Sequence, residues 1–499
     1  WRVLMHLRKI HDYYALKKGT VQSWARVIEH GRPAIRHRLM SSLNRMPPMD
    51  ISDVGYDAFL SNGKKITHLY AAPGENVKLR IINAAASSYF NLEFAGGPMQ
   101  IIENDGIPVE PIIAQRLRIA IAETYDVIVN IPESGAYEFR ASSEDGTGYS
   151  STFIGSGIQI AAPDIPTPNL FLPMHKYHND NHTKGSQNVP HIHHHEHMGH
   201  EVEEVIEYMD DYSELKSPTK TTLPEGRPLR EIYLNLTGYM DGYTWSFNDK
   251  TLIDSDNILI KKGENVRVHF TNKTMMHHPI HLHGHFFRVL NGQGEYSPLK
   301  HTVNVPSMST VTIEFEANTE KDWLLHCHNL YHMSTGMSRI ISYGNKKKHD
   351  YDLLKKLQNN RFYFYFDIAM LSNMTQRIAK MFDDKNAIEF EYYYNYLKEY
   401  DVDIKYVRRL SEFLEVFAGG NYTDPEPAKL HKGTAIFGLR YKLPLFINSE
   451  IRVDSHKHVK FELESEIQLT DRVLFEWYAN TDKEWQMGLS YEWTKHALI

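Results

Sequence analysis

HPIHLHGH at residues 278–285 and HCHNLYHMSTGM at residues 326–337 are the two stretches of this 499-residue chain that decide most about its fold and chemistry. The second stretch contains Cys327, the only cysteine of the chain, with an imidazole on either side. If Cys327 lies on or beside a β-strand, successive side chains point to opposite faces. Cys327 then faces one side of the strand, and His326 and His328 face the other. We therefore expect one strand to serve two metal sites.

The ligand types around Cys327 are those of a blue copper centre, which combines a thiolate and two imidazoles with a weak axial thioether. Pro279 blocks regular strand pairing, so the preceding His278 can turn toward the thiolate. His332 follows Cys327 at a distance that allows the same approach. Met337, five residues further on, is placed to cap the copper axially.

A second set of imidazoles suits a neighbouring cluster. His281 and His283 are two residues apart and share a face, as His326 and His328 do. The alternative is a chance gathering of surface histidines around a buried free cysteine. The neighbouring histidines at 277 and 285 fit a supporting or solvated position at least as well as a ligand position.

Together these residues resemble the multicopper oxidase family, specifically the C-terminal cupredoxin domain of a copper-resistance protein A type oxidase. The flanking segments YTWSFN (243–248), NKTMM (272–276) and KHTV (300–303) strengthen the resemblance. It assigns His278, Cys327, His332 and axial Met337 to the type 1 copper, His281 to the type 2 copper, and His283, His326 and His328 to the type 3 pair. It implies an oxidoreductase with up to four copper ions.

In such an enzyme the type 1 copper accepts electrons from Cu(I) or another small reductant. Cys327, His326 and His328 carry the electrons onward as the catalytic residues, and O₂ is reduced to water at a trinuclear cluster. The partners that the resemblance implies are therefore Cu(I) and Cu(II) ions and O₂. Converting Cu(I) to Cu(II) would lower its toxicity and serve copper tolerance.

An internal repeat predicts two related β-domains. GENVKLRIIN at residues 74–83 recurs as GENVRVHFTN at residues 263–272, each a turn followed by an alternating strand. Only the second copy leads into the histidine-rich motif. The sequence therefore predicts an all-β chain with two cupredoxin-like Greek-key β-sandwich domains, a metal-free one at residues 51–160 and a copper-binding one at residues 229–346.

The trinuclear cluster of this family needs eight imidazoles, four of them from two His-x-His motifs in an N-terminal domain. No His-x-His motif precedes residue 174 here. We therefore expect residues 1–50 to be a linker from a missing N-terminal domain that completes the cluster, so that this chain alone is incomplete as an oxidase.

A linker rich in histidine and methionine is expected between the two domains, at residues 161–228. Its histidines are His175, His178, His182, His191, His193, His194, His195, His197 and His200. Imidazole and thioether groups both suit copper, and copper(II) has the highest affinity of the divalent series. The segment could collect or buffer copper, or it could be a solvated polar linker with incidental metal affinity.

Residues 347–499 change character and alternate between apolar and polar side chains, most clearly in VKFELESEIQL at 459–469. Segments near ten residues long predict an antiparallel β-sheet or a β-barrel-like region, including a transmembrane one with aromatic girdles. This tail resembles the C-terminal part of copper-resistance protein B, an outer-membrane protein, mainly over residues 433–495. The alternative is a soluble antiparallel β-domain.

Composition narrows the function class. The net charge of −7, with both signs interspersed, argues against nucleic acid as the main partner. One cysteine excludes an internal disulfide framework and is compatible with an oxidising compartment. We expect a periplasmic protein, associated with the outer membrane if the tail inserts there.

Three other functions stay open at this point. A copper-binding, sequestering protein without catalysis would fit the missing imidazoles and the histidine-rich linker. A laccase-like phenol oxidase would use the same coppers, and Met337 at the axial position favours a lower potential than that of the strongest laccases without deciding the substrate. A two-domain enzyme like nitrite reductase is disfavoured by the imidazoles on both sides of Cys327, which serve a type 3 pair.

Overall fold

The architecture comes from a computed structural model of the whole chain. It describes residues 21–46, 51–171, 205–239, 242–344, 354, 356–358, 362–370, 374–396, 399–424, 432–494 and 497–498. These residues fall into two compact units. The histidine unit comprises Asp50–Gly238 and Thr244–Asn359, and the tail unit comprises Trp1–Met49, Tyr239–Tyr243 and Asn360–Ile499. The predicted histidine-rich stretch at 174–200 lies outside the described residues.

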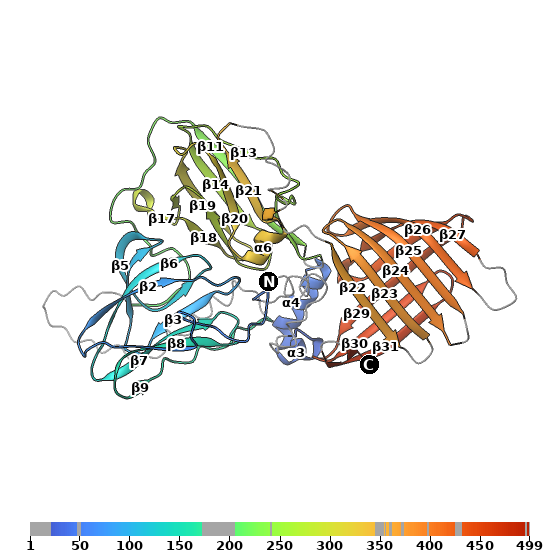
Figure 1. Cartoon of the computed structure of the whole chain (residues 1–499), viewed down its shortest axis with the longest axis horizontal. Helices are drawn as coiled ribbons and strands as arrows, with labels where there is room; N and C mark the ends of the chain where they lie inside the picture. The colour runs from blue at the N-terminus through green and yellow to red at the C-terminus, as the bar shows by residue number, and fades with distance from the viewer. Residues whose placement is uncertain are drawn as a thin grey trace. The chain divides into compact units, whose positions relative to one another are not determined.

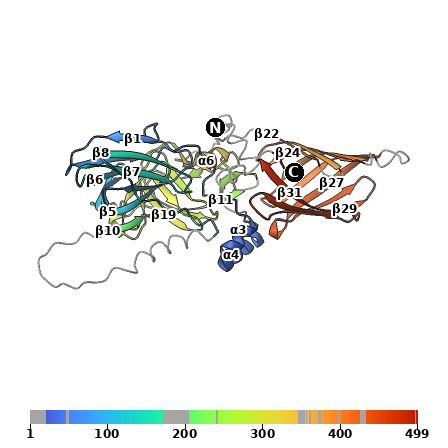
Figure 2. The same ribbon diagram turned by 90° about the horizontal axis from the view of Figure 1, so that it is seen from below.

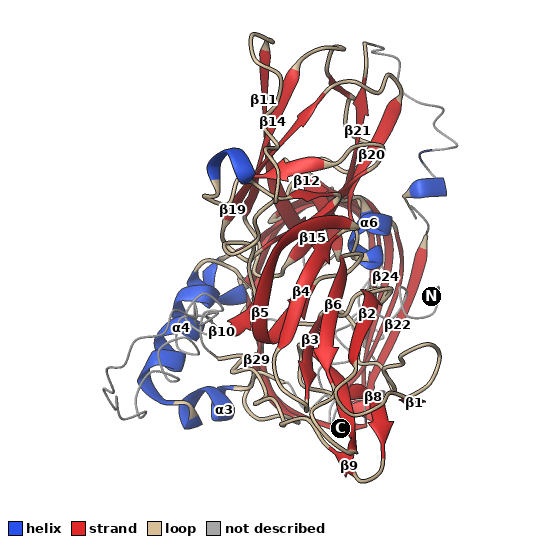
Figure 3. Cartoon of the chain, turned by 90° about the vertical axis from the view of Figure 1, so that its left-hand side faces the viewer, coloured by secondary structure: helices blue, strands red, loops and turns tan. Residues whose placement is uncertain are grey.

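The histidine unit begins with a ten-stranded sheet that folds over on itself. Its strands are β1 (Ile66–Leu69), β2 (Asn76–Ile82), β3 (Phe90–Phe94), β4 (Met99–Asn104), β5 (Ile107–Ile119), β6 (Thr124–Asn130), β7 (Gly135–Ser143), β8 (Tyr149–Ser156), β9 (Gln159–Ile160) and β10 (Val205–Met209). The first half of the long strand β5 pairs with β4 and its second half pairs with β3. This strand, which is labelled in Figure 3, therefore joins the two layers. Buried side chains such as Leu92, Ile101 and Val127 fill the core.

Two further sheets of the histidine unit carry the motifs with the cysteine and the histidines. Six strands are ordered β12-β11-β14-β19-β16-β17, and five are ordered β13-β21-β20-β15-β18 (Figure 1). Their bounds are β11 (Leu229–Tyr239), β12 (Thr244–Phe247), β13 (Ile258–Leu259), β14 (Asn265–Asn272), β15 (His278–Leu282), β16 (Phe287–Val289), β17 (Leu299–Lys300), β18 (Thr302–Val305), β19 (Thr310–Glu316), β20 (Asp322–Cys327) and β21 (Ser338–Ser342). The helices are η1 (Gly294–Tyr296) and α6 (Leu330–Thr335).

The two copies of the sequence repeat make the same contacts. Gly74 and Gly263 have positive φ angles of 80° and 87°, and their N–H groups donate to Ile131 O at 2.6 Å and Ala317 O at 2.8 Å. Glycine is needed there because it adopts positive φ without steric cost. At the end of each repeat a buried asparagine, Asn83 or Asn272, donates to backbone carbonyls of its own domain. The repeat is therefore structural, as the sequence predicts.

The tail unit combines two helices with an antiparallel sheet. The helices are α3 (Trp24–Glu29) and α4 (Gly31–Leu43), within the stretch expected to be a linker. The strands are β22 (Tyr363–Met370), β23 (Met374–Phe382), β24 (Asn386–Asn395), β25 (Tyr400–Arg409), β26 (Leu414–Asp424), β27 (Lys432–Lys442), β28 (Asn448–Asp454), β29 (Val459–Gln468), β30 (Val473–Asn480), β31 (Trp485–Thr494) and β32 (Ala497–Leu498), with η2 (Pro444–Phe446) between β27 and β28. Each strand pairs antiparallel with the next along the chain.

The predicted all-β class, with an antiparallel C-terminal region, is confirmed by this architecture. The exact domain bounds and the linker role of residues 1–50 stay predictions. Among the described residues, no helix is long and apolar enough to cross a membrane.

A buried lysine connects the first sheet of the histidine unit to the strands beside the histidine motif. Lys300 is fully buried, and its Nζ lies 3.2 Å from Asp105 Oδ2, 3.1 Å from Glu123 Oε1 and 2.7 Å from Asn104 Oδ1. Asp105 also accepts from the N–H groups of His301 and Thr302. The turn after β4 thus fixes the path of β17 and β18.

Lys300→Ala should lower the free energy of unfolding by about 3–5 kcal/mol, because it leaves two buried carboxylates without their cation. Urea unfolding of the metal-free full chain measures this. The matched control is Lys262→Ala, whose exposed ion pair with Glu320 should contribute about 0–1 kcal/mol. Equal, small losses in both variants would contradict the role assigned to Lys300.

Candidate metal centre

Strands β15 and β20 bring the two histidine motifs together. They pair antiparallel with Ile280 opposite Cys327 and His281 opposite His326. Because side chains alternate along each strand, His281 and His326 share one face, and Cys327 points to the other. This is the two-sided arrangement expected from the sequence.

On the thiol side, three ligand atoms converge in a fully buried site. Cys327 Sγ lies 3.8 Å from His278 Nδ1 and 3.7 Å from His332 Nδ1, and the two Nδ1 atoms are 3.0 Å apart. Within the described part of the chain, these three residues form a group whose ligand atoms all lie within 4.8 Å of one another. All three side chains have 0% exposure.

Helix α6 returns His332 to the thiol. Its N-cap is Asn329, whose side chain accepts from the N–H groups of Tyr331 and His332, as capping residues do. The helix ends at Gly336, with a φ of 132° and Thr251 Cβ only 2.6 Å from where a Cβ would be. Gly336 therefore allows the sharp turn that leads to Met337.

The backbone of Met337 lies next to that of Cys327. Met337 has 0% exposure, and its carbonyl oxygen accepts from the N–H of Cys327 at 3.0 Å. A thioether is the soft donor that accompanies one thiolate and two imidazoles in a blue copper site.

Both imidazoles are held in place by hydrogen-bond partners of their outer ring nitrogens, which no sequence pattern indicated. His278 Nε2 lies 2.7 Å from Thr274 Oγ1, and His332 Nε2 lies 3.2 Å from Asp53 Oδ1. Trp245 stacks on the ring of His332 at 4.0 Å between centroids. With Nε2 bonded outward in each case, Nδ1 is the nitrogen that faces the thiol.

On the other face of β20, four imidazoles gather. His283 Nε2 lies 3.1 Å from His326 Nε2, and ring centroids of neighbouring members are 4.8–5.8 Å apart. The other members are His281 and His328. This cluster is more open than the thiol site, since His326 is buried, His281 and His328 are half-buried, and His283 is exposed.

Backbone carbonyls orient two of these rings. His281 Nδ1 donates to His301 O at 2.8 Å, and His326 Nδ1 donates to Cys327 O at 2.8 Å. Each bond leaves Nε2 facing the cluster. His301 is the residue positioned by Asp105, so the buried lysine network extends to the imidazoles.

His277 and His285, for which the sequence allowed a supporting or a solvated position, are both buried. His285 Nε2 bonds to the Tyr343 hydroxyl at 2.8 Å, and its Nδ1 bonds to His283 O at 3.1 Å. His277 packs against the ring of Tyr89 at 5.6 Å. Both therefore support the motif from outside the two ligand clusters.

Burial sets the protonation of the metal-free residues. It raises the pKa of the Cys327 thiol well above its ordinary value and lowers the pKa of His278 well below its own. Burial also lowers the pKa of His326 to about 3 and that of His281 to about 4. The imidazoles are thus neutral and ready to coordinate, and Cys327 must lose its proton when a metal binds.

The first sheet lacks these donors at the matching places. In the ladder between β3 and β7, Leu92 lies opposite Ala141 and Glu93 lies opposite Arg140, where the second copy has Ile280 opposite Cys327 and His281 opposite His326. An apolar pair and two charged groups therefore replace the ligands, as expected for a metal-free domain.

The donor set fits copper. One thiol, two convergent Nδ1 atoms and an adjacent methionine are the donors of a blue copper site, and imidazole clusters suit copper as well.

The pH dependence of stability reports on the buried imidazoles. Below pH 6.5 the unfolded chain binds a proton at residue 326, and the folded chain stays neutral there down to about pH 3. The stability contributed by this group is therefore present above pH 6.5 and is lost as pH falls, by about 1.4 kcal/mol per pH unit.

His326→Gln should flatten this decline by ~2 kcal/mol between pH 6.5 and 5 in the metal-free chain, as measured by urea unfolding. His269→Gln, outside both clusters, is the control. Parallel pH profiles for the wild type and His326→Gln would show that His326 titrates normally in the folded state.

Comparison with known proteins agrees with this chemistry. Family models described as multicopper oxidase match residues 29–159 and 227–347. The chain is 32% identical to copper resistance protein A of Escherichia coli, over 68% of this chain and 68% of that protein. It is 31% identical to a copper resistance protein A homolog of Pseudomonas syringae pv. tomato, again over 68% of each. The chain therefore belongs to the multicopper oxidase family, whose members bind type 1, type 2 and type 3 copper, and is an oxidoreductase.

Proposed function

We propose that this protein is a copper oxidase of copper tolerance, which oxidises Cu(I), or another small reductant, and reduces O₂ to water. The observation that carries the proposal is the pair of ligand clusters on opposite faces of β20, joined through adjacent residues of one strand. The names of its relatives, which are copper resistance proteins, support Cu(I) as the substrate.

The residues divide into two sets in this proposal. His278, Cys327, His332 and Met337 would hold type 1 copper, His281 would hold type 2 copper, and His283, His326 and His328 would hold the type 3 pair. Bound copper supplies one-electron redox chemistry, and four Cu(I), four protons and one O₂ give four Cu(II) and two waters.

The chain's own contribution is a short connection between the two sets. Cys327 is bonded to His326 and to His328 through single peptide links, and the Cys327 carbonyl also accepts from His326 Nδ1 at 2.8 Å. The peptide path and this hydrogen bond both link the thiol to an imidazole of the cluster. Full burial keeps water away from the thiol.

The open side of the imidazole cluster supports the idea that further ligands join it. His283 is exposed there, so imidazoles from outside the described residues can approach. We propose that they complete the trinuclear cluster, as the resemblance to the family implies for an N-terminal domain.

Copper sequestration without catalysis is the second candidate. The buried thiol site supports it, because this site is complete without the further imidazoles. Oxygen uptake separates the two candidates: sequestration predicts copper binding with no Cu(I)-dependent oxygen consumption.

We propose the periplasm as the compartment of this reaction, because a single cysteine bound to copper is compatible with oxidising conditions. Association with the outer membrane, expected from residues 347–499, is part of the same proposal.

Cys327→Ser should abolish the blue absorption of the copper-loaded full chain and, with it, Cu(I)-dependent oxygen uptake, because the thiolate is the donor that defines a type 1 site. Optical and EPR spectra measure this, and circular dichroism checks folding. His269→Gln, whose Nδ1 bonds to Thr312 Oγ1 on the neighbouring strand, is the control and should stay blue. A blue Cys327→Ser protein would refute the assignment.

Asp53→Leu should weaken copper binding at the thiol site or lower activity by roughly 10–100-fold, because His332 loses the partner that holds its ring. Asp53→Asn keeps an oxygen acceptor and should lose less. Copper titration and the type 1 reduction potential measure both variants. Unchanged values in both would show that Asp53 does not position His332.

A further inference from the structure

The sheet of the tail unit has its apolar side chains outside. On strands β24, β25 and β27, the side chains of Phe390, Ile404 and Phe437 are 40%, 54% and 61% exposed. Strands near the two edges of the sheet show the same pattern: Phe366 on β22 is 74% exposed, and Leu489 on β31 is 67% exposed. The exposed large apolar residues of this sheet include Phe364, Phe366, Ile368, Met370, Ile388, Phe390, Ile404, Phe437, Leu439, Ile451, Val453, Val459, Phe461, Trp485, Met487 and Leu489. We call this surface the apolar band.

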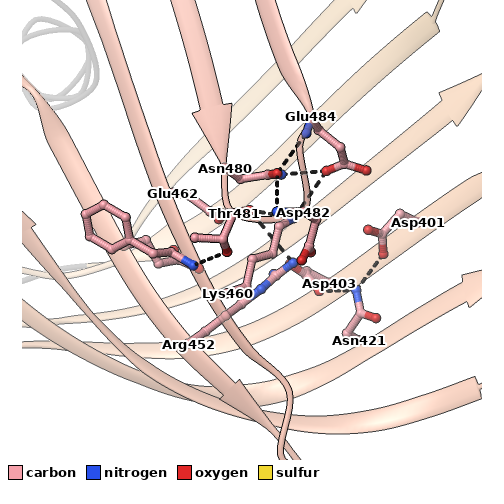
Figure 4. Close-up of polar contacts among 12 residues, drawn as sticks. Asp401, Asp403, Asn421, Arg452, Lys460, Glu462, Asn480, Thr481, Asp482 and Glu484 are labelled. Atoms are coloured by element: carbon pink, nitrogen blue, oxygen red, sulfur yellow. Dashed lines mark hydrogen bonds and ion pairs between the residues drawn. The ribbon is translucent and has the colours of Figure 1, made fainter.

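Charged side chains alternate with the apolar band and point to the other face. Glu389, Asp403 and Lys405 are about as buried as core residues, at 4%, 4% and 3% exposure. Lys405 Nζ lies 3.0 Å from Glu391 Oε2 and 3.0 Å from Asp403 Oδ2. Figure 4 shows part of this inner network, in which Asn421 bridges Asp401 and Asp403.

The sheet curls with this charged face inside. Arg440 on β27 reaches Glu389 on β24 at 2.7 Å, and Arg452 on β28 reaches Asp403 on β25 at 3.0 Å. Each pair is three strands apart, which is roughly 14 Å in a flat sheet. Only strong curvature brings such groups into contact, and Figures 1 and 2 show the strands following a curve.

This distribution is the inverse of a water-soluble sheet. In water, large apolar side chains pack inside and charges remain outside, and contiguous exposed apolar patches rarely exceed a few hundred Å². Here paired charges lie on the inner face beside one small apolar cluster of Ala387, Val407, Phe417 and Ile436, and the apolar band has residues on β22, β24, β25, β27, β28, β29 and β31. The outer face is therefore built for an apolar surrounding.

We propose that β22 to β31 of the tail unit insert into a lipid bilayer, with the apolar band in contact with the hydrocarbon. Strands β24, β25 and β29 are each 10 residues long. Tilted strands of about 9–11 residues span the hydrocarbon layer.

Polarity along the strands matches the layers of a bilayer. Tyr406 and Tyr441 lie on the outer face near one end of the sheet, and Tyr422 and Trp485 lie on it near the other. Aromatic residues of this kind favour the interface between hydrocarbon and water. The turns beyond them are charged, as at residues 383–385 and 481–484.

Arg377, a cation on the outer face, fits this arrangement. Arg377 is exposed, but it lies three residues from the end of β23, and its guanidinium is 5.9 Å from the ring centroid of Tyr392. A long cationic side chain near a strand end can extend to the headgroups.

A bilayer explains the extent of the apolar band better than a protein partner does. A partner or a second copy of the chain would cover one side of a curled sheet, whereas the apolar band has residues on seven strands from β22 at one edge to β31 near the other. Hydrocarbon surrounds all of them.

The topology gives the inserted sheet a direction. Ten antiparallel strands, β22 to β31, begin and end at the same end of the sheet. Helices α3 and α4 pack at that end: Ala25 N donates to Leu469 O at 2.9 Å, and Arg45 Nη1 donates to the Tyr441 hydroxyl at 2.9 Å.

Two adjacent residues of β31 test the proposal. Leu489 points outward, whereas Ser490 points inward and donates to Glu476 Oε2 at 2.6 Å. Cys327 is fully buried, so Leu489→Cys and Ser490→Cys each offer one accessible thiol for an environment-sensitive fluorophore. The labelled full chains are mixed with phosphatidylcholine vesicles that contain brominated lipid, which quenches fluorophores in the hydrocarbon.

We expect the label at 489 to be quenched at least twofold and the label at 490 to be unaffected. Equal quenching at both positions, or none, would overturn the proposal. So would a concentration-dependent change at 489 without lipid, which would indicate a second copy on the apolar band.

The unlabelled wild-type chain provides a measurement that no substitution can disturb. It should float with vesicles in a density gradient and stay with them after an alkaline wash. Recovery of the wild-type chain in the aqueous fraction would refute insertion. Neither experiment depends on copper, so failure of the oxidase proposal would leave the result unchanged.

Discussion

The alternation of side chains along β20 is the constraint on which the metal chemistry depends. Cys327 and His326 are adjacent in sequence, and a strand sends them to opposite faces. Pairing with β15 then places His281 beside His326 and leaves the thiol to meet His278 and His332 on the far side. Two ligand clusters therefore share one short piece of backbone, and a change in register would separate both sets at once.

Around this strand the protein holds donors that would otherwise be costly to bury. Thr274 and Asp53 bond to the outer nitrogens on the thiol side, and His301 bonds to His281 on the other. Buried polar groups are stable only when their hydrogen bonds are made. Asp105 fixes His301, and Lys300 compensates the charge of Asp105. The first sheet, which lacks the ligands itself, thus contributes to their arrangement.

The two units of the chain use the same strand periodicity in opposite ways. In β14 of the histidine unit, apolar residues such as Val266, Val268 and Phe270 are buried. In β27 of the tail unit, Phe437 and Leu439 are exposed. The next residue, Arg440, points to the inner face and pairs with Glu450. Alternation by itself says that a strand has two unlike faces. Which face is covered depends on how the whole sheet curves.

The sequence by itself determined the β-class, the repeat and the eight proposed copper-ligand positions, because strand alternation and ligand chemistry are local properties. It indicated the alternating tail but left open which face would be outside. Only the tertiary structure decided that Asp53, 279 positions from His332, would hold the ring, and that His277 and His285 would be buried supports. It also decided that the stretch expected to be a linker contains helices α3 and α4. These features depend on contacts between distant segments, and no short-range pattern encodes such contacts.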